Sequence, residues 1–378
     1  GGWPLNAALH GPGREIPPAM SDPPSSQTDP SFYARAQAAQ AAGRFEEAAQ
    51  LLWQASRLGD VACMSLLGAQ LMSGRGVRPD AFMGAQLIID AARRGGAYAC
   101  AVAANILASG LSGRRAPDWA GALDYLQRSA ELGHAPAQAQ LRVLARQAEK
   151  PPAGPSAWRE LRQSIDLDAW RASPPARALS ADPAITAVEA FLAPDVCDWI
   201  TGRARERMTP AQVIGPGALA PMQDQIRTNS VAELGLVNTD LVVLLIRDRL
   251  SAACGLPVNA MEVPQVLHYA VGQAFRLHED YLLPDGAHKI RELASHGQRA
   301  RTLLIYLNDG FEGGETDFPL LDLRFKGRKG EALMFPNVLA DGSPDLRMRH
   351  AGLPPTAGEK WLFSQWVRDR NAPGTVPA

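Results

Sequence analysis

Apolar residues recur at helical spacing over residues 32–147, where Ala, Leu, Gln and Arg dominate the composition. This spacing predicts amphipathic helices that bury one face against their neighbours. Beyond residue 263 the apolar residues fall instead in short runs separated by turn residues, which indicates strands. We expect strands over residues 264–269, 301–307, 331–335 and 360–367, and further helices over 194–208 and 238–253. The pattern therefore predicts an α+β protein, with helices first and an antiparallel double-sheet barrel second.

The helical half contains an internal repeat. Similar five-residue sequences occupy residues 55–59, 91–95 and 129–133, and their terminal glycines are 36 and 38 residues apart. Two helices per repeat, with Gly at the turns, are typical of an α-solenoid. Residues 74–92 resemble Sel1-type repeats, which are relatives of the tetratricopeptide class. An Ala-rich helical bundle without repeat stacking is the alternative.

Changes in composition place the domain boundaries. Pro, Gly and Ser dominate residues 1–30, which we expect to be disordered or tag-like because such a segment buries too little apolar surface to fold. Prolines also interrupt the chain around residue 150. The expected parts are 1–30, a helical repeat domain at 31–148, a linker and connecting segment at 149–184, the barrel domain at 185–371 and a tail at 372–378.

Charge and cysteine content narrow the functional classes. Lys and Arg total 38 against 39 Asp and Glu, which gives no support for a nucleic-acid partner. The four cysteines contain no C-x-x-C pair, so reduced thiols and a cytoplasmic location are expected. We find neither a secretory signal pattern nor an apolar run of membrane-spanning length, and we expect no membrane partner.

His278 and Asp280 form part of a possible metal site if they lie at the end of a strand. His278 and Asp280 are two residues apart, so on an extended chain their side chains share one face while Glu279 points away. His350 follows 72 residues later as a third ligand. Two histidines and one carboxylate make the facial triad of non-haem iron(II) oxygenases. Lys360, in the last expected strand, can pair with the distal carboxylate of a dicarboxylate, because a buried lysine requires an anionic partner.

The second half also resembles the prolyl 4-hydroxylase family. The matching motifs lie at residues 269–281, 301–319, 330–337, 350–354 and 358–361, with weaker matches at 191–197 and 227–230. The resemblance implies a double-stranded β-helix (jelly roll) that binds Fe(II) through His278, Asp280 and His350, and 2-oxoglutarate through Lys360. It further implies that Tyr269 and Thr302 contact 2-oxoglutarate and that Trp366 lines the pocket.

The three last roles have plain structural alternatives. Tyr269 and Trp366 could be core aromatic residues, and Thr302 could be an ordinary strand residue with a satisfied hydroxyl. His268, His288 and His296 are spare ligand candidates, the last two in an expected polar loop at 284–299.

The implied function is a 2-oxoglutarate-dependent dioxygenase that hydroxylates a prolyl residue in a peptide or protein. O₂ and 2-oxoglutarate would be consumed, succinate and CO₂ would be co-products, and ascorbate would act as reductant. The helical repeats would bind a protein partner or the substrate. Two alternatives remain: a hydroxylase of a small molecule such as a free amino acid, and an interaction scaffold with an inactive barrel.

Overall fold

The computed structural model describes residues 31–110, 116–147, 156–211, 226–235 and 238–370. The expectations for residues 1–30 and 372–378, and for most of the Pro-rich part of the linker, lie outside the described residues. The chain divides into two compact units, one holding the helices up to Asp166 together with Thr239–Leu244, and the other holding the sheets. Each unit is described by itself.

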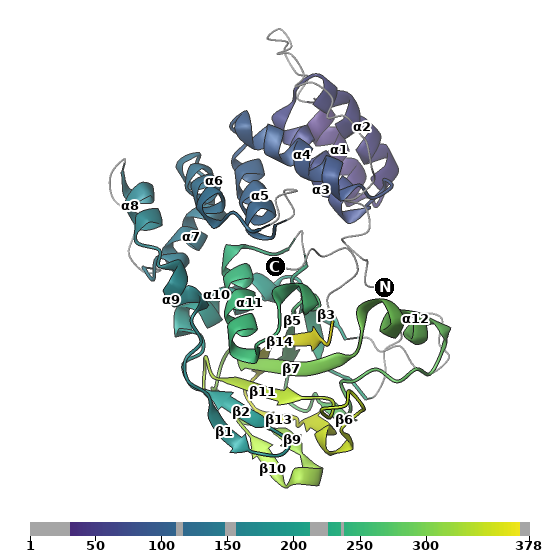
Figure 1. Cartoon of the computed structure of the whole chain (residues 1–378). Coiled ribbons are helices and arrows are strands. Elements are labelled where there is room, and N and C mark those ends of the chain that lie inside the picture. Colours follow the sequence, from purple (N-terminus) through teal and green to yellow (C-terminus); the bar gives the residue numbers. More distant parts are fainter. Residues whose placement is uncertain (1–30, 111–115, 148–155, 212–225, 236–237, 371–378) are drawn as a thin grey trace. The chain divides into compact units, whose positions relative to one another are not determined.

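The first unit consists of helices joined by short turns (Figure 1). These helices are α1 (Ser31–Ala41), α2 (Phe45–Arg57), α3 (Val61–Ser73), α4 (Ala81–Arg93), α5 (Ala97–Ala108), α6 (Trp119–Glu131), α7 (Ala135–Leu144) and α8 (Ala157–Gln163).

The predicted repeat is confirmed in this unit. Gly59, Gly95 and Gly133 follow α2, α4 and α6, and all three have positive φ angles between 85° and 89°. Glycine adopts this backbone conformation without steric cost, which explains its recurrence at one position of each repeat. Helices α3 and α4 pack closely at Gly68 and Gly84, where a Cβ atom on either glycine would lie under 3 Å from the other's carbonyl oxygen.

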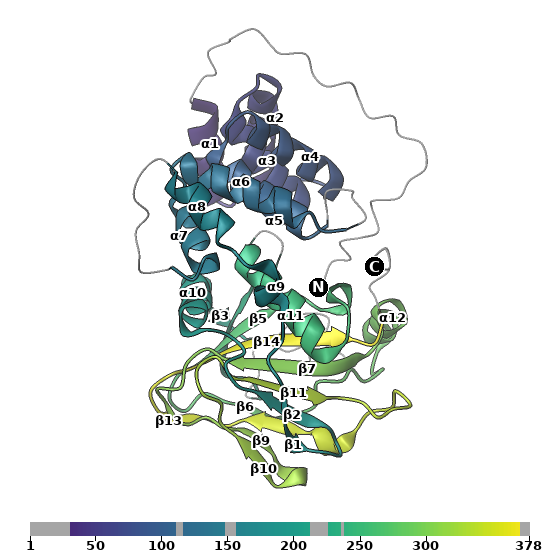
Figure 2. The same cartoon turned by 60° about the vertical axis from the view of Figure 1, so that its left-hand side comes forward.

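The second unit contains two antiparallel sheets of the predicted double-stranded β-helix (Figures 1 and 2). The larger sheet has the strand order β1 (Arg177–Ser180), β2 (Ile185–Val188), β11 (Ala332–Pro336), β7 (Arg299–Tyr306), β14 (Lys360–Arg368), β5 (Gln265–Tyr269), β4 (Ser230–Glu233) and β3 (Thr209–Pro210). The smaller sheet has the order β10 (Leu323–Phe325), β9 (Thr316–Phe318), β12 (His350–Gly352) and β6 (Phe275–His278), and β8 (Glu312–Gly313) pairs with β13 (Pro355–Ala357).

Helices accompany these sheets. They are α9 (Leu167–Arg171), α10 (Pro194–Arg205), α11 (Leu241–Cys254), α12 (Ala287–His296) and the short 3₁₀ turns Val258–Ala260, Pro319–Leu321 and Leu346–Met348. Helix α10 packs against β4 and β5. The four strands and the helices at 194–208 and 238–253 that the apolar pattern predicts are therefore present, within three residues at each end.

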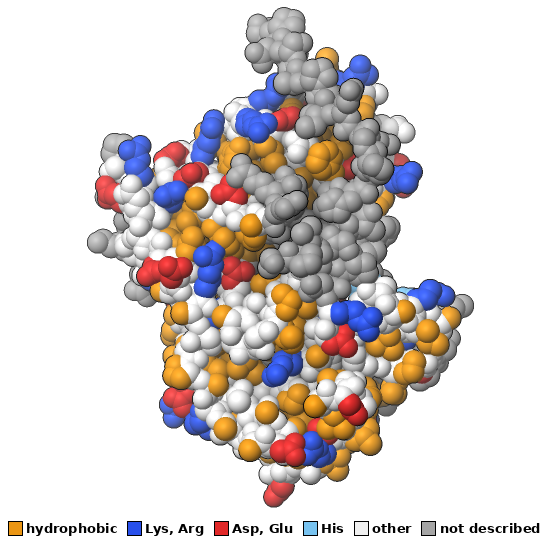
Figure 3. Space-filling model, viewed as in Figure 1, with side chains coloured by type: hydrophobic (Ala, Val, Ile, Leu, Met, Phe, Trp, Pro, Cys, Tyr) orange, Lys and Arg blue, Asp and Glu red, His pale blue; other side chains and the backbone are white. Residues whose placement is uncertain are grey.

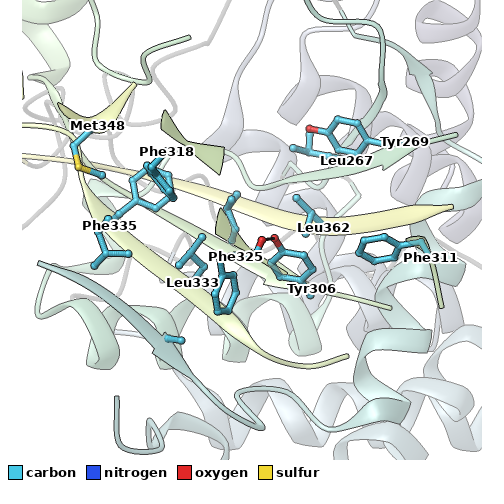
Figure 4. Packing of buried hydrophobic residues seen from close by; sticks show 13 residues of the cluster. Leu267, Tyr269, Tyr306, Phe311, Phe318, Phe325, Leu333, Phe335, Met348 and Leu362 are labelled. Carbon is cyan, nitrogen blue, oxygen red and sulfur yellow. Dashed lines mark hydrogen bonds between the residues drawn. The ribbon is translucent and has the colours of Figure 1, made fainter. Parts of the chain in front are cut away.

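The core of this unit lies between the two sheets (Figure 4). Every second residue of the large sheet faces it, including Leu267 and Tyr269 of β5 and Leu304 and Tyr306 of β7. This alternation follows from the two-residue period of a strand. Phe318 of the small sheet meets Phe335 of the large one edge-to-face, with ring centroids 5.0 Å apart. The packed aromatic layer fixes the position of the strands that carry the candidate site.

One expectation about a connection is wrong. The segment 284–299, expected as a polar loop, contains helix α12 and begins β7. Ile290 and Leu293 are three residues apart, so the segment does carry a helical apolar spacing, but it is too short to stand out from its polar neighbours. The segment 149–184 also carries regular structure, because α8, α9 and β1 lie within it.

The surface of the described residues shows no dominant charge on the face drawn in Figure 3, where Lys and Arg side chains alternate with Asp and Glu. Among the described helices, none combines the length and the apolar character needed to cross a membrane.

Candidate metal centre

The two predicted histidine ligands lie side by side on neighbouring strands of the small sheet. His350 of β12 is paired directly with His278 of β6, and their ring centroids are 4.3 Å apart. Each ring uses Nδ1 in the same way: His278 Nδ1 lies 2.7 Å from the carbonyl of Arg276, and His350 Nδ1 lies 2.9 Å from that of Met348. A carbonyl oxygen only accepts, so both Nδ1 atoms carry the proton and donate it. Both Nε2 atoms are thereby left with a lone pair for a metal.

Asp280 completes the cluster two residues after His278. Its Oδ1 lies 3.5 Å from His278 Nε2, and its Oδ2 lies 3.6 Å from His350 Nε2. The carboxylate is buried, and burial by itself raises its pKa. The two histidines and a hydrogen bond from Thr302 outweigh burial and hold the pKa of Asp280 below its ordinary value. Burial lowers the pKa of His350 to about 4. The cluster therefore presents two imidazole Nε2 atoms and one carboxylate to the same point.

These three side chains form a group that can hold a metal ion. Their ligand atoms all lie within 4.8 Å of one another, and no second group of this kind occurs among the described residues. The neighbouring Glu279 points away, as expected from the strand period, and pairs with Arg349 at 2.8 Å. Glu279 follows His278 and Arg349 precedes His350, so this ion pair joins the two segments next to the histidine pair.

Lys360 lies in the same cavity as these ligands. The cavity is partly open and is lined by Lys360 together with His278, Asp280 and His350. The Lys360 side chain is fully buried, and its Nζ has no hydrogen-bond partner among the described residues. Burial lowers the pKa of Lys360 to about 7. An orphaned buried ammonium fits an anionic ligand, because the ligand's charge would offset the desolvation cost.

The other predicted site residues divide into two groups. Tyr269 and Trp366 line the cavity, and the Lys360 Nζ is 5.1 Å from the centre of the Tyr269 ring. Thr302 is not among the lining residues, and its hydroxyl donates to Asp280 over 2.6 Å. Its contact with 2-oxoglutarate stays a prediction.

The spare histidines lie apart from the cluster. His268 is one residue before Tyr269 and accordingly faces the other side of the sheet, where its Nε2 meets Glu359 at 2.9 Å. His288 and His296 belong to α12, and neither is in the metal-ligand group.

Several cavity residues received no role from the sequence. Arg227 and Thr316 line the cavity, and Arg227 lies over the Phe275 ring at 4.8 Å. Both belong to segments that match the family motifs, so the motifs contained the signal, but only the fold shows which side chains point inward. The buried Asn337 lies behind Thr302, to which its Nδ2 donates over 2.9 Å.

A partly buried ion-pair network borders the cavity at Trp366. Arg299 lies over the Trp366 ring at 3.7 Å and donates two hydrogen bonds to Glu262, of 2.7 and 2.9 Å. Arg368 also contacts Glu262, at 2.6 Å, and reaches Glu292 of α12 at 2.6 Å. No sequence motif suggested this network, because its members come from four separate segments.

Comparison with known proteins assigns the region that holds the candidate metal centre to a protein family. Residues 264–368 match the model of the 2OG-Fe(II) oxygenase superfamily. Prolyl 4-hydroxylase 1 of Arabidopsis thaliana is 30% identical over 206 residues, which cover 51% of this chain and 71% of the plant protein.

Solved structures match both halves of the chain. A viral collagen prolyl hydroxylase from Paramecium Bursaria Chlorella virus-1, in a 2OG complex, is 25% identical and covers 48% of this chain and 94% of its own, with a TM-score of 0.37. A Sel1 repeat protein from Oxalobacter formigenes is 20% identical and covers 39% of this chain and 64% of its own, with a TM-score of 0.29.

The sequence match includes the two strands that carry the triad histidines and the strand that begins with Lys360. The protein therefore belongs to the prolyl 4-hydroxylase family of 2-oxoglutarate-dependent Fe(II) dioxygenases.

Proposed function

We propose that the protein hydroxylates prolyl residues of a peptide or protein. In the overall reaction, a prolyl C–H bond, O₂ and 2-oxoglutarate give the hydroxylated residue, succinate and CO₂. Fe(II) and 2-oxoglutarate, when bound, supply the oxidising chemistry, and ascorbate serves as the reductant that keeps the iron in its ferrous state. The chain's own residues bind and orient these groups.

One observation carries the proposal: the unpaired ammonium of Lys360 and the His-Asp-His group share one cavity. Two histidines and a carboxylate suit Fe(II) and leave other coordination positions open. A buried cation suits the distal carboxylate of 2-oxoglutarate. Neither feature alone selects this cosubstrate, but together they match both ends of a keto dicarboxylic acid.

The proposed roles follow from the geometry of each side chain. His278, Asp280 and His350 hold Fe(II), with the two imidazoles oriented by their Nδ1 hydrogen bonds to backbone carbonyls. Lys360 holds the distal carboxylate of 2-oxoglutarate, beside the ring of Tyr269. Trp366 is a side wall of the cavity, and Arg299 stacks on it. Buried hydrophobic residues such as Leu304 and Leu362 line the rest and limit water.

A prolyl substrate is favoured over a free amino acid by the relatives, which are named prolyl 4-hydroxylases. The helical repeats also favour a macromolecule, since stacked helix pairs offer an extended surface to a protein partner or substrate. The buried, unpaired thiols of Cys63, Cys100 and Cys197 are consistent with a reducing compartment, and we propose the cytoplasm.

The test is incubation of the full chain with Fe(II), 2-oxoglutarate and ascorbate and a library of proline-containing peptides. Mass spectrometry would locate added oxygen, and succinate would be measured in parallel. We expect one hydroxyl per modified proline and a matching yield of succinate.

Two variants serve as controls. Asp280→Ala removes a proposed iron ligand and should abolish both products, whereas Asp341→Ala alters an exposed carboxylate on the 339–343 turn and should keep both. Succinate without modified peptide would move the substrate to a small molecule. If the iron-loaded, folded protein made no succinate at all, the scaffold alternative would replace the proposal.

A further inference from the structure

Asp280 is held from behind by two buried polar side chains. Thr302 of β7 donates its hydroxyl hydrogen to Asp280 Oδ2 over 2.6 Å, and Asn337, directly after β11, donates from Nδ2 to Thr302 Oγ1 over 2.9 Å. Thr302 and Asn337 are each only 1% exposed. The three side chains thus form one chain of hydrogen bonds that starts in the large sheet and ends on the carboxylate.

The direction of this chain is fixed by chemistry. The Asp280 carboxylate, taken as a metal ligand, only accepts hydrogen bonds, and its Oδ2 accepts one from the Thr302 hydroxyl. Thr302 has a single hydroxyl hydrogen and donates it to Asp280. Toward Asn337 its oxygen can therefore only accept. The Asn337 amide must therefore present Nδ2 to Thr302. Asn337 Oδ1 is left without a hydrogen-bond partner among the described residues, and burying this oxygen unpaired is unfavourable. We call the hydrogen-bonded chain Asn337–Thr302–Asp280 the relay.

Backbone hydrogen bonds fix the position of the Asn337 main chain. Its N–H donates to the carbonyl of Ala300 in β7, and its carbonyl accepts from the N–H of Asp345. Thr302 lies opposite Phe335 in the β7–β11 pairing, so Thr302 and Asn337 of the relay are set by strand register. This part of the relay is consequently rigid, whereas Asp280 itself follows the end of β6 and belongs to no strand.

We propose that Thr302 and Asn337 are positioning residues that orient Asp280 for metal binding, and that Thr302 acts on the metal through Asp280 and does not hold 2-oxoglutarate. The inference rests on the proposed function, since it takes Asp280 as an Fe(II) ligand. The hydrogen bond to Oδ2 fixes rotation of the carboxylate and turns Oδ1 toward His278. Partners behind a metal ligand typically change metal affinity about 10–100-fold when they are removed.

The experiment measures Co(II) affinity of the metal-free full chain by calorimetry, without 2-oxoglutarate, and records the visible spectrum of bound Co(II). Thr302→Val keeps the side-chain shape and removes the hydroxyl, and we expect Co(II) affinity to fall about 10–100-fold with an altered spectrum. Thr302→Ser keeps a donor and should restore affinity to near the original value. Asn337→Ser shortens the far end of the relay and should lower affinity in the same direction by a smaller factor.

The binding of 2-oxoglutarate, measured at saturating Co(II), separates the two roles of Thr302. The inference is overturned if Thr302→Val leaves Co(II) affinity unchanged, and in particular if it weakens only 2-oxoglutarate binding. Asp280→Ala distinguishes this failure from that of the proposed function: if Asp280→Ala also binds Co(II) normally, the metal site itself is wrong. Should Thr302→Val prove unfolded by circular dichroism, the Asn337→Ser affinity decides in its place.

Discussion

Lys360 lies directly opposite Tyr269 in the pairing of β14 with β5, and its ammonium is 5.1 Å from the centre of the Tyr269 ring. Tyr306, on the other neighbouring strand, has its ring centre 5.4 Å from the same ammonium. Aromatic faces attract a cation, but they supply no hydrogen-bond acceptor for it. The position of Lys360 is therefore suited to binding an anion and unfavourable without one.

Replacing Lys360 by Met should abolish 2-oxoglutarate binding and stabilise the ligand-free protein at neutral pH. Burial lowers the pKa of Lys360 to about 7 from 10.5, with Glu315 as the nearby charge that opposes the shift. Between these two values the unfolded chain binds more protons than the folded one, so this group makes stability rise with pH from about 7 to about 10.5. The variant should lose that rise and be more stable at pH 7, on the order of a few kcal/mol.

Thermal unfolding of the metal-free protein at several pH values would measure this effect. Lys329→Met is the matched control, because Lys329 is partly exposed and paired with Asp198. A Lys360→Met protein that is no more stable than the parent at pH 7 would mean that the ammonium has a partner in the ligand-free protein.

The candidate metal-ligand group and the buried lysine could be predicted from the sequence, because recognising these residues and their order in the chain does not require the strand register. His278, Asp280, His350 and Lys360 stand in motifs, and the two-residue period already places Glu279 outside. The contacts of Thr302 could not be predicted in this way. Its hydroxyl meets Asp280 and Asn337, 22 and 35 positions away. The pairing of β7 with β11 brings Asn337 to Thr302, whereas Asp280 follows β6 of the other sheet.

The helical unit shows the same division. The spacing of Gly59, Gly95 and Gly133 predicted helix pairs, since a left-handed turn residue has a local cause. Helix α12 was missed because its ten residues are flanked by turns and none of them is buried. A solvent-exposed helix lacks the broad apolar stripe on which sequence patterns depend.

Metal binding should stabilise the protein against heat through the triad. A ligand that binds only the folded state at about 100 times its dissociation constant contributes about 2.7 kcal/mol. We expect Co(II) to raise the unfolding midpoint of the parent protein and to leave that of Asp280→Ala unchanged. Protonation of His350 should not weaken this response at pH 6, because burial lowers the pKa of this ligand to about 4. An equal shift in both proteins would indicate that the ion binds elsewhere.

Glu262→Gln should destabilise the oxygenase unit. Glu262 accepts from Arg299 and contacts Arg368, so loss of its charge deprives Arg299, 18% exposed, of this anion and leaves Arg368, 8% exposed, paired with Glu292. Breaking such a pair costs about 3 kcal/mol, reduced where a side chain is partly exposed, as Glu262 is at 20%.

The network also gives a pH dependence with a defined sign. Burial opposes ionisation of Glu262, but Arg299 and Arg368 outweigh it and lower the pKa. The stabilisation is therefore complete above the unfolded-state pKa of about 4.5 and is lost as the pH falls through the folded value. Thermal midpoints of Glu262→Gln and the parent should converge in acid. The control Asp124→Asn, in an exposed pair with Arg162, should change stability by less than about 1 kcal/mol.

Gly84→Ala should destabilise the helical repeats although Ala favours helices. A Cβ at residue 84 would lie 2.7 Å from the Gly68 carbonyl oxygen and 2.7 Å from Met72 Cγ, so α3 and α4 must separate. Such overpacking costs about 1–3 kcal/mol, which exceeds the gain in helix propensity of about 1 kcal/mol. Hydrogen exchange should therefore become faster in α3 and α4, while 2-oxoglutarate binding stays unchanged.

Gly202→Ala in α10 isolates the propensity effect, because a Cβ there meets no atom within 4 Å. This control should be neutral or more stable by up to about 1 kcal/mol. If both substitutions stabilised the protein, the helices would have room to move apart and the close approach at Gly68 would carry no packing energy. If Gly84→Ala alone accelerates exchange, the glycines on the facing surfaces of α3 and α4 are required by contact between the helices, and not by the backbone conformation that explains the turn glycines.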